Sequence, residues 1–343
     1  MLDDRKKRVL RAIVDDYIAT AEPVGSRTIA RKYRLGVSPA TIRNEMADLE
    51  ELGYLEQPHT SAGRIPSDKG YRFYVDRLML PARLTEEDVS RIRRIYEEKA
   101  REIQTLIHQT ARVLAETTNY LALVLGPQLE KATFQRLTLV PLRPGLALLV
   151  LVTDAGFVQT ASVEVPQGVR DEELHHIAQV LTVRLAGVPI DVLAEAALKE
   201  LQDELSAYRG ILRKMVEVLV EVVQDSVDDR VYMGGASRIF EQPEFRDVNR
   251  ARAVLGVLEH EQTIRELLNA NAPDQGVMVA IGGETGMDAT RECSLVCTTY
   301  EIAGVATGRI GLLGPKRMDY ARAVAILRYV EDCLSMALSR SAG

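Results

Sequence analysis

The side chains best suited to recognise another molecule lie in one segment near the N-terminus, residues 38–52. Ser38 and Pro39 are typical of a helix start, because a serine hydroxyl can cap a helix and proline has no N–H to satisfy there. At helical spacing the apolar residues share one side, so Arg43 and Asn44 face outward with small residues beside them. Arginine can form two hydrogen bonds to guanine and asparagine two to adenine, although in isolation such a polar face could simply be solvated. The predicted DNA contacts of this helix are Ser38, Ala40, Thr41, Arg43, Asn44 and Ala47.

A hairpin is expected directly after this helix. Residues 54–57 have the composition of one strand and residues 64–66 that of a return strand, joined by a polar loop at residues 58–63. A hairpin that follows the second helix of a helix-turn-helix predicts a winged helix, whose loop contacts the DNA backbone or the minor groove. The predicted DNA contacts of the wing are His59, Thr60, Ser61 and Arg64.

Three further helices are expected to hold this surface in place. Apolar residues at helical spacing after Asp3 predict a first helix that ends near Thr20. Ser26 is expected to cap a short second helix that runs to Tyr33, and a glycine-containing turn then leads to the third helix. Ser26 and Arg27 at the start of the second helix are also predicted to contact DNA. A last helix is expected over residues 67–78.

The charge distribution indicates that a nucleic-acid partner would bind at the N-terminal segment. The 343 residues contain 43 Lys and Arg and 49 Asp and Glu, a net charge of −6. Residues 1–80 hold 14 of the basic and 12 of the acidic residues, a net charge of +2, which leaves 29 and 37, a net charge of −8, for the rest. A small basic module on an acidic body is therefore expected.

Composition argues against several other classes of protein. With 46% hydrophobic and 27% charged residues the chain has the composition of a globular protein. Apolar runs such as residues 146–152 are far shorter than the roughly 20 residues that cross a bilayer, so no membrane partner is expected. Three cysteines are too few for a disulfide framework, which favours the cytoplasm.

The body of the chain offers little chemistry. Residues 282–286 are rich in glycine but lack the Lys-Ser/Thr ending of a phosphate loop, so a hairpin turn is expected there. Cys293 and Cys297 have no second cysteine pair and no nearby histidine, which favours buried small side chains over a metal site. No catalytic motif is found, so we expect neither an enzyme nor a cofactor or metal.

The order of elements in the body predicts an α+β protein with an insertion. From residue 85 to Gly126 apolar residues recur at helical spacing, which predicts either one helix of about 40 residues that packs against another subunit or a break near residues 117–119. Strands, a mostly helical stretch, strands again and a last helix then follow. Strands are expected at residues 134–140, 146–153, 157–165, 230–233, 277–282, 293–300 and 308–313, and helices at 171–186, 191–225, 246–269 and near the C-terminus.

Four stretches have a distinctive sequence: Val37–Glu50 with the following Gly53–Leu55, the wing His59–Pro66, Pro23–Ser26, and Gly314–Tyr320. Together they closely resemble the HrcA family, the bacterial heat-inducible transcription repressors. The resemblance spans nearly the whole chain, with the most specific motifs in the N-terminal segment.

The resemblance implies an α+β multidomain protein with a winged helix-turn-helix, a GAF-like domain and a mostly helical inserted dimerising domain. It further implies a homodimer that represses chaperone genes from an inverted-repeat operator in double-stranded DNA, and a GroEL-type chaperonin that promotes the DNA-binding form. The alternative is a regulator gated by a small molecule in the GAF-like domain. The expected boundaries are residues 1–80 for the winged helix, 81–100 for a linker and the start of the long helix, 101–168 with 275–343 for the GAF-like domain, and 169–274 for the insertion.

Overall fold

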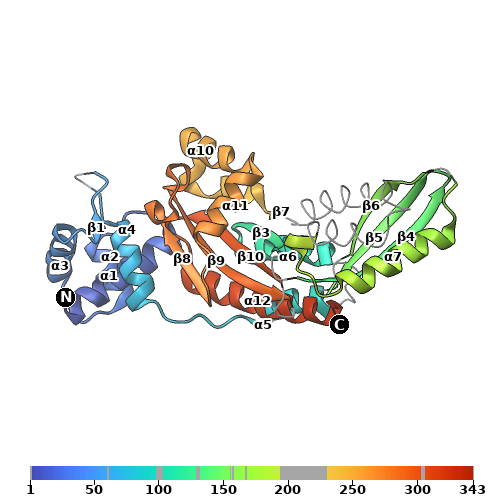
Figure 1. Ribbon diagram of the computed structural model, residues 1–343. Coiled ribbons are helices and arrows are strands. Elements are labelled where there is room, and N and C mark those ends of the chain that lie inside the picture. Colours follow the sequence, from blue (N-terminus) through green and yellow to red (C-terminus); the bar gives the residue numbers. More distant parts are fainter. Residues whose placement is uncertain are drawn as a thin grey trace.

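The computed structural model arranges the chain as three units in a row (Figure 1). The N-terminal unit comprises residues 2–78, the central unit is built around a five-stranded sheet, and the distal unit around a three-stranded sheet. The pairings between the described strands are antiparallel, so the expected α+β class is confirmed. Within the described ranges no helix is long and apolar enough to cross a membrane. The structure describes residues 2–59, 62–97, 103–128, 132–154, 156, 158–166, 168–193, 230–302 and 306–342.

The N-terminal unit packs three helices and a short hairpin around one apolar core. The Asp3 side chain accepts a hydrogen bond from the Lys6 amide at 2.8 Å and so caps the first helix, which ends where Ala21 has a positive φ of 56°. The first helix thus has the expected limits. The elements are α1 (Asp4–Thr20), α2 (Ser26–Tyr33), α3 (Pro39–Glu51), β1 (Leu55–Glu56), β2 (Ile65–Pro66), α4 (Asp68–Phe73) and a π-helical turn (Tyr74–Leu78).

The last helix of this unit docks closely on the base of the hairpin. The Ser67 hydroxyl accepts a hydrogen bond from the Gly70 amide at 3.1 Å and donates one to the Gly53 carbonyl at 2.7 Å. A Cβ on Gly70 would lie 2.2 Å from the carbonyl oxygen of Tyr54, so this approach requires glycine. The expected helix over residues 67–78 is found, but its second half is a π-helical turn.

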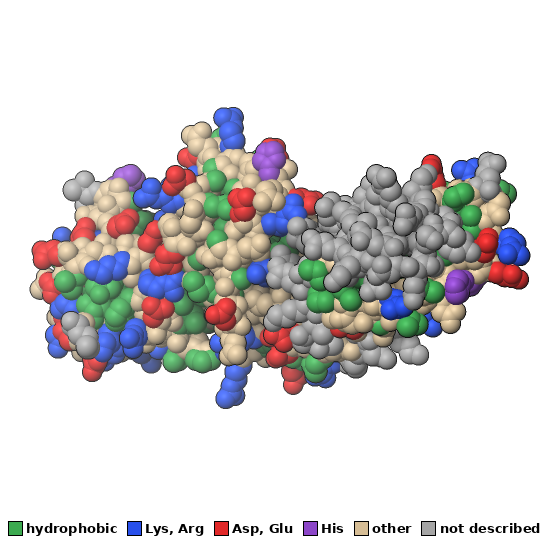
Figure 2. Space-filling model, viewed as in Figure 1, with side chains coloured by type: hydrophobic (Ala, Val, Ile, Leu, Met, Phe, Trp, Pro, Cys, Tyr) green, Lys and Arg blue, Asp and Glu red, His purple; other side chains and the backbone are tan. Residues whose placement is uncertain are grey.

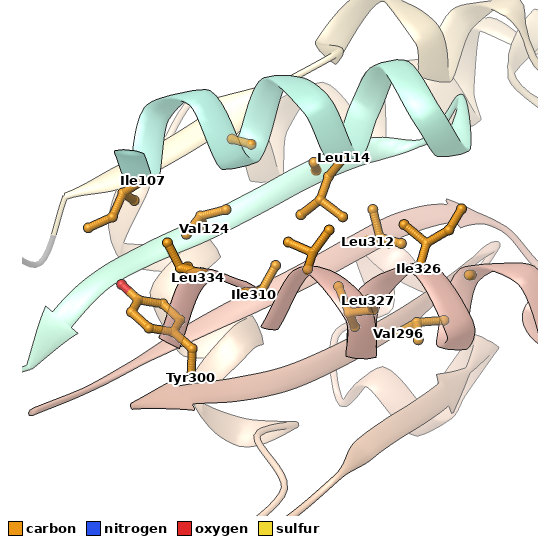
Figure 3. Close-up of a cluster of buried hydrophobic side chains, with 14 of the residues drawn as sticks. Ile107, Leu114, Val124, Val296, Tyr300, Ile310, Leu312, Ile326, Leu327 and Leu334 are labelled. Atoms are coloured by element: carbon orange, nitrogen blue, oxygen red, sulfur yellow. The ribbon is translucent and has the colours of Figure 1, made fainter. Parts of the chain in front are cut away.

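The central unit is a sheet covered by helices on both faces. Its strands have the order β7-β3-β10-β9-β8. Along β3 the side chains of Leu121, Leu123 and Leu125 pack with α10 and α11, whereas Ala122 and Val124 face α6 and α12 (Figure 3). This alternation is the period of two that a sheet buried on both faces requires. The elements are α5 (Glu86–Glu97), α6 (Ile103–Thr118), β3 (Leu121–Gln128), β7 (Val231–Gly234), 3₁₀ turns at Ala236–Glu241, Pro243–Arg246, Gly282–Thr285 and Asp288–Thr290, α10 (Val248–Leu258), α11 (Glu261–Ala270), β8 (Val277–Ile281), β9 (Cys293–Ile302), β10 (Ala306–Pro315) and α12 (Tyr320–Ala342).

The long helix expected after residue 85 is not formed. The hydroxyls of Tyr96 in α5 and Thr110 in α6 lie 2.7 Å apart, so the two helices pack against each other instead of continuing as one rod. Helix α6 ends at Thr118, where Asn119 adopts a positive φ of 60°, and the expected break near residues 117–119 is confirmed. Residues 121–126 were expected in the helix but form a strand, because successive apolar side chains there pack alternately on the two faces of the sheet.

The distal unit is a three-stranded meander covered by one helix. Its strands pair in the order β4-β5-β6, which confirms the expected antiparallel strands. Side chains of α7, including Leu174, Ile177 and Leu181, are buried with Leu137 and Leu149 of the sheet. The elements are β4 (Phe134–Arg143), β5 (Leu146–Thr153), β6 (Val158–Glu164), α7 (Asp171–Leu185) and a 3₁₀ turn at Ile190–Val192.

The sheet pairings differ from the expected domain boundaries. Strands at 134–164 were assigned to the domain of residues 275–343, yet they pair only with one another among the described strands. Conversely, β7, α10 and α11 were assigned to the insertion, but β7 pairs with β3 and both helices pack on the central sheet. One helix expected over residues 246–269 is two helices, and most of that expected over 191–225 lies outside the described residues.

Candidate nucleic-acid interface

Helix α3 begins as its sequence predicts. The Ser38 hydroxyl accepts a hydrogen bond from the Thr41 amide at 3.1 Å, and the two hydroxyls lie 2.9 Å apart. Pro39 occupies the first turn, where its missing N–H costs nothing. Both hydroxyls therefore already take part in the cap, which fixes the start of the helix and leaves Ser38 exposed beside it.

The outward face of α3 brings together the predicted base contacts. Ile42, Met46 and Leu49 are at most 4% exposed and anchor the opposite side of the helix in the core. The side chains of Arg43 and Asn44 are exposed, and they form no hydrogen bond or ion pair with the described residues. The exposed small residues on the same face are Ala40 and Ala47.

A groove joins this face to the second helix and the hairpin. It has a volume of about 580 Å³ and lies between the N-terminus of α2, the middle of α3 and the base of the hairpin. Sequence reasoning identified four of its residues and missed Gln57, which looked like part of a strand. The lining residues are Val24, Gly25, Ser26, Arg27, Arg43, Met46, Gln57, Ala62, Gly63 and Arg64.

The start of α2 differs in detail from the expectation. Ser26 is the first helical residue, and Gly25 occupies the cap position without a side-chain hydrogen bond. Ser26 therefore does not cap the helix, because the cap lies one residue earlier. Ser26 is partly exposed and Arg27 is exposed, and both line the groove.

The hairpin after α3 is held close to the body of the N-terminal unit. Leu55 pairs with Pro66 and Glu56 with Ile65, and Gly63 lies against the backbone of Val24. A Cβ on Gly63 would approach the Val24 carbonyl oxygen to 2.5 Å, so this approach also requires glycine. His59 is exposed at the hairpin tip, whereas Thr60 and Ser61 lie outside the described residues.

Arg64 forms an ion pair within the unit. Its Nε donates to Oε2 of Glu50 at 2.8 Å, and its Nη2 lies 2.7 Å from the same oxygen. Only 19% of the Arg64 side chain is exposed. The guanidinium therefore joins the return strand to the end of α3, and a DNA phosphate would have to compete with Glu50 for it.

Basic residues at the start of α1, within residues 5–8, also form ion pairs. Lys6 Nζ lies 2.9 Å from carboxylate oxygens of both Glu45 and Asp48. These hydrogen bonds, first to Asp48 and then to Glu45, raise the pKa of the Lys6 ammonium. Lys7 pairs with Asp4 at 3.1 Å. Lys6, together with Arg5 at 3.5 Å from Glu45, thus orients α3 on α1, a role for which the local sequence gives no signal.

The described residues show no site for a metal ion. No group of three His, Cys, Asp or Glu among them could hold one. Burial raises the pKa of both the Cys293 and the Cys297 thiols to about 12, so these side chains are protonated at neutral pH. They contribute to the core beneath α10 and α11, as expected.

Comparison with known proteins identifies the class of protein to which the chain belongs. The chain is 46% identical over 339 residues to a heat-inducible transcription repressor HrcA of Pelotomaculum thermopropionicum, which covers 99% of this chain and 97% of that protein. A relative with the same name from Symbiobacterium thermophilum is 48% identical over 335 residues, 98% of either chain. These similarities and the exposed face of α3 define a DNA-binding transcription repressor.

The family follows from a second match. Residues 104–324 match the family described as HrcA protein C terminal domain. The chain belongs to the HrcA family. A crystal structure of a protein described as hypothetical has a TM-score of 0.64 and 25% identity, with 99% of this chain and 98% of that one covered.

Proposed function

We propose that residues 2–78 form a winged-helix unit and that the chain represses heat-shock genes, including chaperone genes, by placing α3 in the major groove of an operator. The observation that carries this proposal is the exposed face of α3. Arg43 and Asn44 project from it with no partner among the described residues, and Ala40 and Ala47 let the helix approach a groove floor closely.

The remaining predicted contacts lie around α3 and would bind the DNA backbone in this proposal. Ser38, Thr41, Ser26 and Arg27 lie at helix N-termini, where amides and cations can hold phosphates and set the register of α3 on the duplex. His59, with Thr60 and Ser61, would follow the backbone from the hairpin tip.

The repressor acts as a homodimer on an inverted repeat in this proposal, since one recognition helix occupies only a half-site. The distal sheet supports a dimer surface. One face of β5 is buried against α7, and its other face carries Leu146, Leu148, Val150 and Val152, which are half-buried. Val140 (41% exposed) pairs with Leu148, and Val158 (58% exposed) pairs with Val152, so the apolar face is continuous across strands.

The central unit is the GAF-like domain in this proposal, and a GroEL-type chaperonin promotes the DNA-binding form. Support comes from membership of a heat-inducible family and from the apolar surface that unfolding would expose to a chaperonin. Operator occupancy measured against temperature, with and without chaperonin and ATP, tests this part. Equal recovery without chaperonin would contradict it and favour a small-molecule signal.

A footprint on the DNA upstream of the protein's own gene cluster tests the repressor function. We expect two protected half-sites related by two-fold symmetry, with base contacts in consecutive major grooves on one side of the duplex. Protection that is uniform along the fragment, or equal on unrelated DNA, would contradict sequence-specific repression.

A further inference from the structure

The chain connection leaves the N-terminal unit free to change its angle on the central unit. Residues 79–85 between the π-helical turn and α5 have no helix or strand, and they run as an extended strap beneath the molecule (Figure 1). A strap of this kind limits distance and leaves orientation free. The orientation must therefore come from side chains at the junction between the two units.

The first junction contact is a bidentate ion pair. Arg72 of α4 donates from Nε to Oε1 of Glu284 at 3.0 Å and from Nη2 to Oε2 of the same carboxylate and to the Val279 carbonyl. Nη1 also donates to Asp76 at 3.2 Å, within α4 and the turn that follows it. The fork geometry of arginine and carboxylate fixes direction as well as distance.

A second arginine, from the central unit, forms a hydrogen bond to the N-terminal unit. Arg317, between β10 and α12, donates to the Ile18 carbonyl at the end of α1 at 3.1 Å, and pairs with Glu244 on its own unit. Next to it, Lys316 lies 3.0 Å from Asp68 of α4 and 3.7 Å from Glu292. Figure 2 shows basic and acidic side chains close together where the N-terminal and central units meet.

Two buried polar atoms near the centre of the junction have no hydrogen-bond partner in the described structure. The rings of Tyr71 and Tyr320 meet edge to face with centroids 5.9 Å apart. Tyr71 is 2% exposed, yet its hydroxyl has no hydrogen-bond partner, and Oε2 of Glu244 is likewise buried and unpaired in the described structure. The apolar clusters of the two units meet at this aromatic contact, but the ion pairs and unpaired buried oxygens beside it are features of a contact between domains.

We propose that Arg72 and Arg317 are positioning residues that set the angle of the N-terminal unit on the central unit, and thereby the operator half-site spacing that the dimer accepts. This inference rests on the proposed dimer. Helix α4 faces the central unit and α3 lies at the opposite end of the N-terminal unit (Figure 1), so a small rotation at the junction displaces α3 by a larger distance. Half-sites one helical turn apart tolerate little displacement.

The test is a charge exchange at the Arg72–Glu284 pair in the full-length protein. Wild type, Arg72→Glu, Glu284→Arg and the double exchange are titrated against operators with the native spacer, with spacers changed by a few base pairs, and with one half-site only. We expect wild type to lose about 100-fold in affinity when the spacer changes, because only one half-site is then engaged. Arg72→Glu should narrow that difference in affinity to about threefold. The double exchange should restore part of the difference, because a carboxylate at position 72 also lies beside Asp76 and the Val279 carbonyl.

Two controls separate positioning from charge and folding. Arg91→Glu makes the same charge change at an exposed pair with Glu87 in α5, away from the junction, and should retain wild-type spacing preference. Glu284→Gln is a milder variant that keeps the inference testable if an exchanged protein fails to fold. Half-site affinity should be the same for all variants.

The outcomes distinguish the two proposals. A wild type that binds all spacers equally would contradict the proposed dimer on an inverted repeat. A sharp spacing preference in wild type that persists in both Arg72→Glu and Glu284→Gln would overturn the positioning role and leave the dimer intact. So would a loss of spacing preference that the double exchange does not restore even in part.

Discussion

The arginines of the recognition surface and those of the junction are chemically identical but differ in their surroundings. Arg43 and Arg27 are exposed and form no ion pair with the described residues, whereas Arg72 and Arg317 are each held by a carboxylate and a backbone carbonyl. An exposed guanidinium can bind DNA without first losing a partner, while a paired one fixes geometry. The difference shows that basic residues counted along a sequence overstate the cations available to DNA, because Arg64 and Lys6 are also paired.

The largest effect on operator binding is expected when the N-terminal unit is separated from the rest of the chain. A fragment of residues 1–80 should be monomeric and should bind the operator about 100-fold or more weakly than the full chain, because it loses the second half-site. Sedimentation of the fragment and of residues 81–343 measures their association, titration against the operator measures the affinity of the fragment, and circular dichroism checks folding. The prediction fails if the fragment dimerises and the remainder does not.

Removal of an exposed guanidinium should cost specificity. Arg43→Ala should lose about 1–3 kcal/mol of operator binding and relax the preference at one base pair, with unchanged thermal stability. Arg31→Ala is the matched control, since Arg31 is an exposed arginine on α2 outside the groove. Equal losses for Arg43→Ala on operator and random DNA would contradict base recognition.

The paired arginine of the wing should show a smaller, sequence-independent effect. If Arg64 leaves Glu50 for a phosphate, Arg64→Ala lowers the slope of log affinity against log salt by about 1. Glu50→Gln should then strengthen binding to all sequences severalfold, because the guanidinium no longer needs to leave a carboxylate. Titration at several salt concentrations measures both, and unchanged slopes in both variants would confine Arg64 to its role inside the unit.

The smallest effect concerns the pH dependence of the junction. Burial raises the pKa of Glu284, but hydrogen bonds from Arg72 and from the Ile281 amide outweigh it, so the pKa lies below its ordinary value of 4.5. A carboxyl whose pKa is lowered on docking stabilises docking above that ordinary value, and the contribution is lost as the pH falls through the docked pKa. Small-angle scattering between about pH 5 and pH 3 should show the units separating, with a weaker pH dependence in Glu284→Gln.

Local signals made the N-terminal unit predictable. Asp3 and Ser38 accept hydrogen bonds from amides three residues further on, and Pro39 suits a first turn because it lacks an N–H, so the local sequence locates the starts of α1 and α3. The outward face of α3 follows from the same periodicity. No local pattern predicts the ion pairs Lys6–Glu45 and Arg64–Glu50, because their residues lie 39 and 14 positions apart in the sequence.

The errors in the body have a common physical origin. Residues 121–125 are all apolar, so periodicity alone does not separate a helix from a strand there, and pairing with β10 and β7 makes them a strand. Likewise, short strands at residues 134–164 resemble those of the central sheet, but their partners are decided by contacts distant in sequence. Strand pairing of this kind is set by tertiary context and not by propensity.

The distal unit leaves and rejoins the central sheet at neighbouring points. The chain departs at the end of β3 and returns in β7, which pairs directly with β3, and the Gly126 amide donates to the Arg230 carbonyl at 3.0 Å. Insertions with adjacent ends are tolerated because they leave the host framework undisturbed. The distal unit is thus a module that can be exchanged, shortened or replaced by a tight turn, which would alter the proposed dimer surface while the central sheet keeps its strand pairing.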